Sequence, residues 1–190
     1  MNPDGRGDGL AASLKKAIFV DRDDTLIRDV PYNGDPDTVE LMPGAREACQ
    51  ALKKLGFEIF IISNQSGVGR GIITREQVER VNQRVLELVG DSIFSGIYCC
   101  FDAPDAQDEG CRKPSPKMIL TAAREHHLDL CKSIMIGDKL TDVQAGKKAG
   151  CLAICFDWQS KVKDNCKGEA DFIAANWQQA LDWIKTVNPL

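Results

Sequence analysis

Short apolar runs alternate with amphipathic stretches along most of the chain, and this alternation predicts an α/β fold. The runs are uninterrupted and rich in Ile, Val or Phe, which is typical of strands buried on both faces of a parallel sheet. Residues 171–173 are a candidate edge strand. The main runs cover residues 17–20, 59–62, 93–99, 134–136 and 152–156.

The amphipathic stretches carry helix start and stop signals. Thr74 and Gln77 form a capping box ahead of an apolar stripe that ends at Gly90, which predicts a helix between them. Strands that alternate with helices in this way predict a doubly wound fold with a mostly parallel sheet. Further helices are predicted from Pro43–Gly44 to Gly56, from Pro116 onward, from 140 to 149, and after the capping residue Asn176.

The composition fits one soluble domain. The 190 residues are 43% hydrophobic and 27% charged. No apolar run approaches the roughly 20 residues of a membrane span. The first 16 residues are polar and Gly-rich, so we expect a flexible segment over 1–16 and a single domain over 17–190. With a net charge of −4 and no hydrophobic signal sequence, we expect a cytoplasmic monomer that binds neither nucleic acid nor a membrane.

Eight cysteines are more than such a chain needs. Cys49, Cys131, Cys151 and Cys155 lie in or beside apolar stretches. In a reducing cytosol we expect these four to be small, buried hydrophobic residues.

Polar motifs follow each of the first four apolar runs, and each motif alone also has an ordinary structural explanation. After the first run, Asp21 and Asp23 are two residues apart, so their carboxylates can converge on one point. A turn capped by Asp side chains would also explain them. After the second run, the segment 63–67 (SNQSG) offers hydroxyl and N–H donors for an anion, although a polar turn explains it equally well.

After the third run, Arg112 and Lys113 precede a proline, in a segment that a solvated loop would also explain. Asp138 follows the fourth run, with Lys139 beside it and Asp142 four residues on; a helix N-cap with a first-turn acid is the alternative. In a doubly wound fold all four segments meet at the carboxyl ends of the strands. Two of the strand ends carry acidic side chains, another carries a hydroxyl group, and the remaining one carries basic side chains. Together they predict a Mg²⁺ site beside a phosphate-binding cradle.

The motifs VDRDDT, ISNQSG, CRKPSP and IGDKLTD, in this order, resemble those of the haloacid dehalogenase-type phosphatases over about residues 17–156. The segments DVPYNGDPDTVELMPGA and SNQSGVGRG are closer still to the heptose 1,7-bisphosphate phosphatases and the related histidinol phosphatases. The resemblance implies a haloacid dehalogenase-like Rossmannoid fold. It also implies a Mg²⁺-dependent phosphomonoesterase that works through an aspartyl-phosphate.

The same resemblance implies roles for individual residues. Asp21 would attack phosphorus, and Asp23 would protonate the leaving oxygen and then activate water. Ser63 and Lys113 would hold the phosphoryl oxygens. The residues implied in substrate binding are Asp29, Tyr32, Asn64, Gln65, Ser66, Arg112 and Lys139.

The Mg²⁺ site implied by the resemblance uses three residues. The side chains of Asp21 and Asp138 and the backbone carbonyl of Asp23 would bind the ion, and Asp142 would support them without touching it.

The spacing of the motifs leaves no room for the separate cap domain that many relatives carry, because Asp21 and Ser63 are 42 residues apart and Ser63 and Lys113 are 50 apart. We expect a small phosphorylated sugar or amino alcohol as substrate, with D-glycero-D-manno-heptose 1,7-bisphosphate ahead of histidinol phosphate. A catalytically inactive relative that binds a phosphorylated ligand is the alternative from another class. No G-x-x-x-x-G-K-[ST] loop occurs, which argues against a kinase or GTPase. Specificity would come from the loops 28–37, 66–73 and 101–112.

Two places depart from the family pattern. Asp24 stands where the family usually has Gly, but Asp tolerates unusual backbone angles, so we expect the turn to survive. Many heptose phosphatases bind a structural Zn²⁺ in a loop whose ligand positions here are Cys100, Asp102, Glu109 and Cys111. Carboxylates at two of these positions weaken a zinc site, so we expect a metal-free loop held by its own packing.

Overall fold

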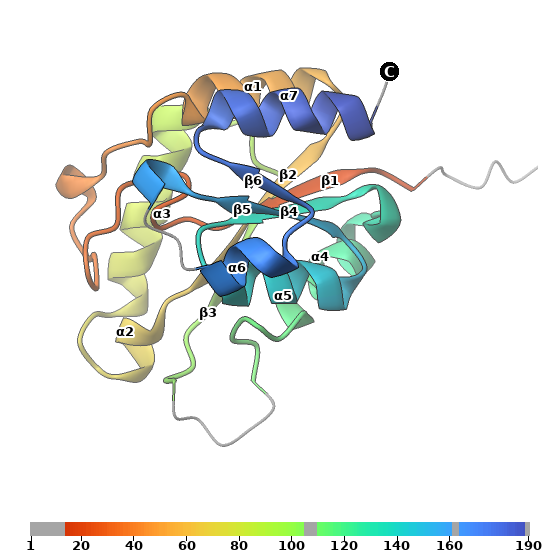
Figure 1. Cartoon of the computed structure of the whole chain (residues 1–190). Helices are drawn as coiled ribbons and strands as arrows, with labels where there is room; N and C mark the ends of the chain where they lie inside the picture. The colour runs from red at the N-terminus through yellow and green to blue at the C-terminus, as the bar shows by residue number, and fades with distance from the viewer. Residues whose placement is uncertain (1–13, 105–109, 161–163, 189–190) are drawn as a thin grey trace, which may run out of the picture.

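The computed structural model contains a six-stranded parallel sheet and describes residues 14–104, 110–160 and 164–188. Every neighbouring pair of strands is parallel, in the order β3-β2-β1-β4-β5-β6 (Figure 1). The doubly wound fold with a mostly parallel sheet is therefore confirmed. The strands are β1 (Ala17–Val20), β2 (Glu58–Asn64), β3 (Gly96–Cys100), β4 (Ile134–Gly137), β5 (Leu152–Phe156) and β6 (Phe172–Ala174).

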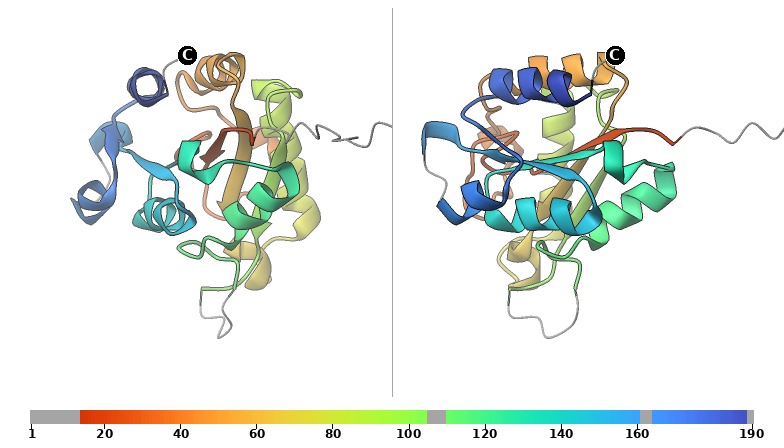
Figure 2. Two further views of the ribbon diagram at one scale, coloured as in Figure 1. Left: turned by 90° about the vertical axis from the view of Figure 1, so that its right-hand side faces the viewer. Right: turned by 45° about the vertical axis from the view of Figure 1, so that its right-hand side comes forward.

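Helices cover both faces of the sheet, so the described part of the chain has three layers (Figures 1 and 2). One layer consists of α1 (Ala45–Lys54), α3 (Arg75–Val89) and α7 (Trp177–Val187). The other consists of α4 (Lys117–His126), α5 (Leu140–Ala149) and α6 (Asp164–Glu169). Shorter elements are α2 (Ser66–Gly69) and the 3-10 turns η1 (Pro36–Thr38), η2 (Leu130–Lys132) and η3 (Trp158–Ser160).

The hydrophobic core has one part on each face of the sheet, because successive side chains of a strand point to opposite faces. In β1, Ile18 and Val20 pack with α1, α3 and α7, whereas Ala17 and Phe19 pack with α4 and α5. All four residues are at most 1% exposed. This double burial explains why the run is continuously apolar rather than alternating.

Most predicted boundaries agree with the structure. The capping box of Thr74 and Gln77 is present, α5 ends before Gly150 as predicted, and Asn176 caps α7 through the N–H of Gln179. β3 begins at Gly96 rather than at residue 93, because the N–H of Ile93 closes a turn onto Gly90.

The expectation that four cysteines are buried is confirmed for three of them and wrong for Cys131. Cys49, Cys151 and Cys155 are buried, whereas Cys131 is exposed. The reason is local: Cys131 lies in η2, a surface turn in which the Asp129 carboxylate accepts a hydrogen bond from the Cys131 N–H.

The order of the strands places a ligand-binding edge between β1 and β4. These two strands are neighbours at the centre of the sheet, and the chain leaves them toward opposite sides. Loops therefore diverge at their carboxyl ends and leave a crevice, the usual binding position in open α/β sheets. Within the described part of the chain, no helix combines the length and apolar character needed to cross a membrane.

Candidate active site

A pocket of about 320 Å³ opens at the carboxyl edge of the sheet. It brings together segments that follow β1, β2 and β4 with the segment before α4. All seven residues predicted to bind substrate line it, whereas Ser63 and Asp138 lie outside its lining. The lining residues are Asp21, Arg22, Asp23, Asp29, Val30, Pro31, Tyr32, Asn33, Asn64, Gln65, Ser66, Gly67, Arg112, Lys113, Lys139, Thr141 and Asp142.

Three carboxylates form a cluster at this edge of the sheet, and two of them, Asp21 and Asp142, line the pocket. Asp21 follows β1, Asp138 follows β4 and Asp142 lies in the first turn of α5. One oxygen of each lies within 4.8 Å of the others. Asp142 accepts a hydrogen bond from the N–H of Lys139 at 2.9 Å, which anchors its carboxylate at the start of α5.

Lys113 lies between two of these acids. Its Nζ atom is 2.5 Å from Oδ1 of Asp21 and 2.6 Å from Oδ1 of Asp142, and it also donates to the carbonyl of Ile62 at 2.8 Å. Burial alone would lower the pKa of Lys113, but Asp142 and Asp21 raise it to about 12. The ammonium group therefore stays charged and offsets part of the negative charge of the pocket.

Asp138 has the properties of a cation ligand. Among the described residues its buried Oδ1 atom has no hydrogen-bond partner, and Nζ of Lys139 lies 3.6 Å from its Oδ2. Burial and then the neighbouring Asp21 raise the pKa of Asp138 to about 8. A hard divalent cation would relieve both the repulsion and the unpaired oxygen, so the donor set fits Mg²⁺.

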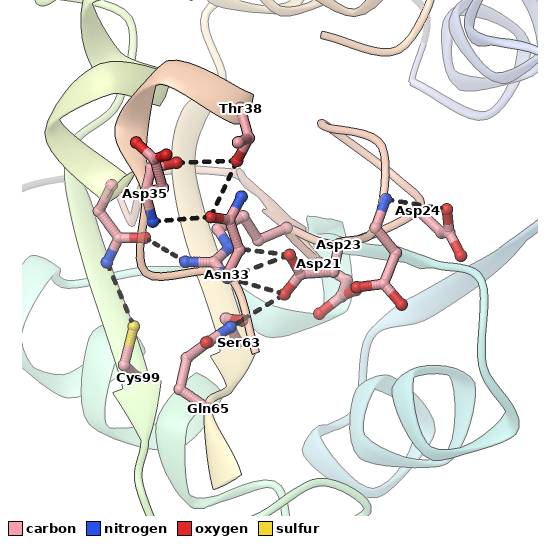
Figure 3. Close-up of polar contacts among 12 residues, drawn as sticks. Asp21, Asp23, Asp24, Asn33, Asp35, Thr38, Ser63, Gln65 and Cys99 are labelled. Atoms are coloured by element: carbon pink, nitrogen blue, oxygen red, sulfur yellow. Dashed lines mark hydrogen bonds and ion pairs between the residues drawn. The ribbon is translucent and has the colours of Figure 1, made fainter. Parts of the chain in front are cut away.

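Asp23 is held differently from Asp21, although the two were expected to converge on one point. Its Oδ2 accepts a hydrogen bond from Gln65 at 2.9 Å, and both of its oxygens accept from Arg22 (Figure 3). The cluster of acids that could hold a metal contains Asp21 but not the carboxylate of Asp23. The two carboxylates thus line one pocket with different partners.

Ser63 and Asn64, at the end of β2, contact residues that line the pocket. The Oγ of buried Ser63 accepts from Gln65 Nε2 at 2.8 Å. Asn64 accepts from the N–H of Lys113 at 3.0 Å and donates to its carbonyl at 3.3 Å. These two backbone contacts fix the Lys113 segment against β2, which delivers the ammonium group to Asp21.

The outer part of the pocket carries basic and aromatic groups. Among the described residues the buried NH1 of Arg112 has no hydrogen-bond partner, so it is available to an anionic ligand. Tyr32 is 42% exposed, and its hydroxyl accepts from Arg70 at 3.0 Å. This contact connects loop 28–37 to loop 66–73, two of the three loops that were expected to determine substrate specificity.

The turn at Asp24 survives without glycine, as expected. Asp24 has a φ of 56°, and its carboxylate accepts the N–H of Asp29 at 3.2 Å. The side chain is thereby directed to the backbone of the neighbouring loop. Burial and then the charge of Asp23 raise the pKa of Asp29.

The loop before Lys113 contains a disulfide between Cys100 and Cys111. Oδ2 of Asp102 lies 3.2 and 3.3 Å from the two sulfur atoms and accepts the N–H of Cys111 at 3.0 Å. Glu109, the fourth position compared with zinc ligands, lies outside the described residues. The described part of the loop is thus held by a covalent bond, where packing alone was expected.

Arg22 and Asn82 were not among the predicted site residues, yet both contact the network around Asp23. Arg22 donates to Asn82 at 2.9 Å. One signal was available: Asn82 lies four residues after Val78, in the apolar stripe of α3, where a polar side chain needs a partner.

Comparisons with known proteins show the family to which the chain is similar. A family model for haloacid dehalogenase-like hydrolases matches residues 32–150. The chain is 34% identical over 181 residues to the D-glycero-beta-D-manno-heptose-1,7-bisphosphate 7-phosphatase of Helicobacter pylori strain J99, over 91% of this chain and 99% of that protein. It is 40% identical over 141 residues to the protein of the same name from Photorhabdus laumondii, over 70% of this chain and 75% of the relative.

A similar fold occurs among solved structures. The D,D-heptose 1,7-bisphosphate phosphatase of B. bronchiseptica, complexed with magnesium and phosphate, superposes with a TM-score of 0.79 and covers 91% of this chain and 99% of its own. The two sequences are 23% identical, so this likeness concerns the fold.

Proposed function

The chain belongs to the haloacid dehalogenase-like hydrolase family and is a phosphatase, and we propose that its substrate is D-glycero-D-manno-heptose 1,7-bisphosphate. Relatives named for the 7-phosphatase reaction match most of the chain, which supports this choice. The proposed reaction removes the phosphate from the 7-position and leaves the 1-phosphate in place.

One observation carries the proposal. Lys113 is paired with Asp21 and Asp142 in the pocket, and the buried Oδ1 of Asp138, which belongs to the same acidic cluster, lacks a hydrogen-bond partner among the described residues. Such a group of acids around one cation suits a metal ion and a phosphoryl group together, since each neutralises charge on the other. A site for an uncharged ligand would not need this concentration of charge.

In the proposed mechanism a carboxylate oxygen of Asp21 attacks phosphorus while the bond between phosphorus and the sugar oxygen breaks. Asp23 gives its proton to that oxygen. It then accepts a proton from water, whose oxygen attacks the aspartyl-phosphate, releases phosphate and restores Asp21. Lys113 and Ser63 stabilise the charge on the phosphoryl oxygens.

The Mg²⁺ ion would be held by the side chains of Asp21 and Asp138 and by the backbone carbonyl of Asp23. When bound, it supplies the positive charge that lets a phosphate approach a carboxylate. Asp142 contributes by keeping Lys113 in place.

The seven residues proposed for substrate binding all line the pocket. Arg112 and Lys139 supply positive charge, and the exposed ring of Tyr32 can cover a sugar. Polar lining residues favour a hydroxylated substrate over an apolar one. The others are Asp29, Asn64, Gln65 and Ser66.

A phosphate-release assay tests the proposal. Heptose 1,7-bisphosphate and histidinol phosphate are compared with and without Mg²⁺, and we expect the sugar bisphosphate to have the higher kcat/KM and to require the ion. Asp21→Asn should abolish turnover and leave the fold intact, while Asp182→Asn, at an exposed position on α7, is the matched control. Higher kcat/KM on histidinol phosphate would overturn the substrate assignment, and an active Asp21→Asn would overturn the nucleophile.

A further inference from the structure

Arg22 stands between the two catalytic aspartates in the sequence but is 1% exposed, an unusual position for a guanidinium. Its Nε and NH2 atoms donate to Oδ1 of Asp23 at 3.2 and 3.0 Å, and NH2 also donates to Oδ2 at 3.1 Å. The planar guanidinium thus binds both oxygens of one carboxylate through a fork of two nitrogen donors. Together with the Gln65 contact, it fixes the rotation of the Asp23 side chain.

The other side of the guanidinium is anchored away from the pocket. Its NH1 donates at 2.9 Å to Oδ1 of Asn82, a residue of α3 that is 7% exposed. The amide of Asn82 in turn donates to the sulfur of Cys99 in β3 at 3.5 Å. A chain of contacts therefore runs from the edge strand β3 to Asp23 (Figure 3). The orientation of Arg22 is therefore determined by α3 as well as by its own loop.

Burying a guanidinium is costly unless every donor has a partner. Packing alone would be served as well by an apolar side chain of similar size, which carries no such cost. The contacts of Arg22 instead converge on the one carboxylate that the proposed mechanism uses to move protons, and that carboxylate is 15% exposed at the pocket. This convergence indicates a positioning role.

We propose that Arg22 and Asn82 are positioning residues for proton transfer, and this inference rests on the proposed function. The fork holds Asp23 at the angle from which its carboxyl group passes a proton to the departing sugar oxygen. As the phosphorus–oxygen bond breaks and the bond to Asp21 forms, that proton leaves Asp23, and the resulting carboxylate is the form that the charged fork stabilises. Arg22 itself touches neither substrate nor metal in this scheme.

The leaving group separates this role from a merely structural one. An alkyl phosphate needs its departing oxygen protonated, whereas p-nitrophenolate leaves without a proton. Because kcat/KM reports the steps up to release of the alcohol, a misplaced Asp23 lowers it for alkyl esters selectively. General damage to the fold lowers kcat/KM for both substrates together.

The experiment measures kcat/KM of Asn82→Ala and Arg22→Lys on p-nitrophenyl phosphate and on heptose 1,7-bisphosphate, whose 7-phosphate is an alkyl ester. We expect about a 10-fold or larger loss on the alkyl ester and less than about a 3-fold loss on the aryl ester. Arg22→Met should lose more than Arg22→Lys, which retains the charge without the fork. Arg84→Ala, at a partly exposed arginine of the same helix as Asn82, is the control, and thermal unfolding verifies that each variant is folded.

Asp23→Asn separates a failure of the positioning role from a failure of the proton-transfer role of Asp23. If Asp23→Asn shows the selective loss but folded Asn82→Ala and Arg22→Lys lose activity equally on both esters, or lose none, the positioning role is overturned and the proposed function stands. If Asp23→Asn shows no selective loss, the proton-transfer role of Asp23 is overturned and the inference fails with it. If the wild-type chain hydrolyses neither ester, the proposed function itself fails.

Discussion

Lys113 and Asp21 form an ion pair of 2.5 Å although 92 residues separate them in the sequence. Both side chains are almost fully buried, at 2% and 7% exposed. Asp142 binds the same ammonium group from α5, so one cation connects the segment after β1, the loop before α4 and the start of α5. The position of the proposed nucleophile thus depends on two distant parts of the chain.

Replacing Lys113 with Met should affect stability as well as catalysis. The variant leaves Asp21 and Asp142 buried without their partner, which we expect to lower the free energy of unfolding by about 3 kcal/mol. Loss of a phosphoryl-binding cation should lower kcat by about 100-fold or more. Urea denaturation and phosphate release measure the two effects, with Lys148→Met, exposed on α5, as the control. A stable and active Lys113→Met chain would contradict the assignment.

Gly137, the last residue of β4, leaves space for Asp142. A Cβ atom at this position would lie 2.5 Å from Cγ of Asp142, a contact that the buried carboxylate has no room to avoid. We therefore expect Gly137→Ala to displace Asp142 from Lys113 and to lower kcat by about 10-fold or more. Gly168→Ala is the matched control, since a Cβ there meets nothing within 4 Å. Equal activity of the two variants would show that the Asp142 position is not needed.

The elements with local signals could be predicted from the sequence. Strands such as Leu152–Phe156 follow from an apolar run, and α3 follows from the capping box at Thr74, because each signal lies within a few residues. The polar motifs could be assigned to one edge because parallel strands place all their carboxyl ends together.

Features that depend on tertiary contacts could not be predicted in this way. The pairing of Arg22 with Asn82 joins residues 60 apart, and nothing near either one indicates the other. The four-residue helix α2 and the six-residue helix α6 are too short to show a helical period. The exposure of Cys131 depends on the turn that carries it, not on the apolar residues beside it.

Substitutions at Asp24 should separate its backbone role from its side-chain role. Its φ of 56° is strained for most residues, and its carboxylate accepts the N–H of Asp29. Asp24→Gly relieves the strain and should retain both stability and kcat, whereas Asp24→Ala loses the contact and retains the strain, at a cost of about 1 kcal/mol. Thermal unfolding and phosphate release compare the pair. A large fall in kcat for Asp24→Gly would assign the carboxylate a chemical role.

Glu58 at the start of β2 should make stability depend on pH. Hydrogen bonds from Lys53 and Ser95, followed by Lys15, lower its pKa from 4.5 to about 2. Because the folded value lies below the unfolded one, this stabilisation is complete above the unfolded pKa and is lost as the pH falls toward 2.

At neutral pH the free energy of unfolding of the wild type should therefore exceed that of Glu58→Gln by about 1 kcal/mol, a figure reduced for solvent screening. This difference in stability, the gap between the two proteins, should narrow between pH 5 and pH 3. Denaturation at a series of pH values tests this, with Glu79→Gln, exposed on α3, as the control for a lost charge. A gap that stays constant or widens in acid would contradict it.

The Cys100–Cys111 pair permits two mutually exclusive states, because sulfur atoms bonded to each other cannot act as thiolate ligands of zinc. We predict the bonded state for protein purified without chelator or reductant: six of the eight cysteines titrate as thiols after denaturation, eight do so after reduction, and zinc is not stoichiometric. Cys111→Ser should lower the free energy of unfolding by about 2 kcal/mol, because the disulfide restricts the unfolded chain and the variant removes that restriction. Cys131→Ser, which changes an exposed free thiol, is the control and should leave the free energy of unfolding unchanged. Elemental analysis and thiol titration decide between the states. About one zinc per chain, together with eight thiols that become reactive when a chelator is added, would show that the loop binds metal through Cys100, Asp102 and Cys111 instead.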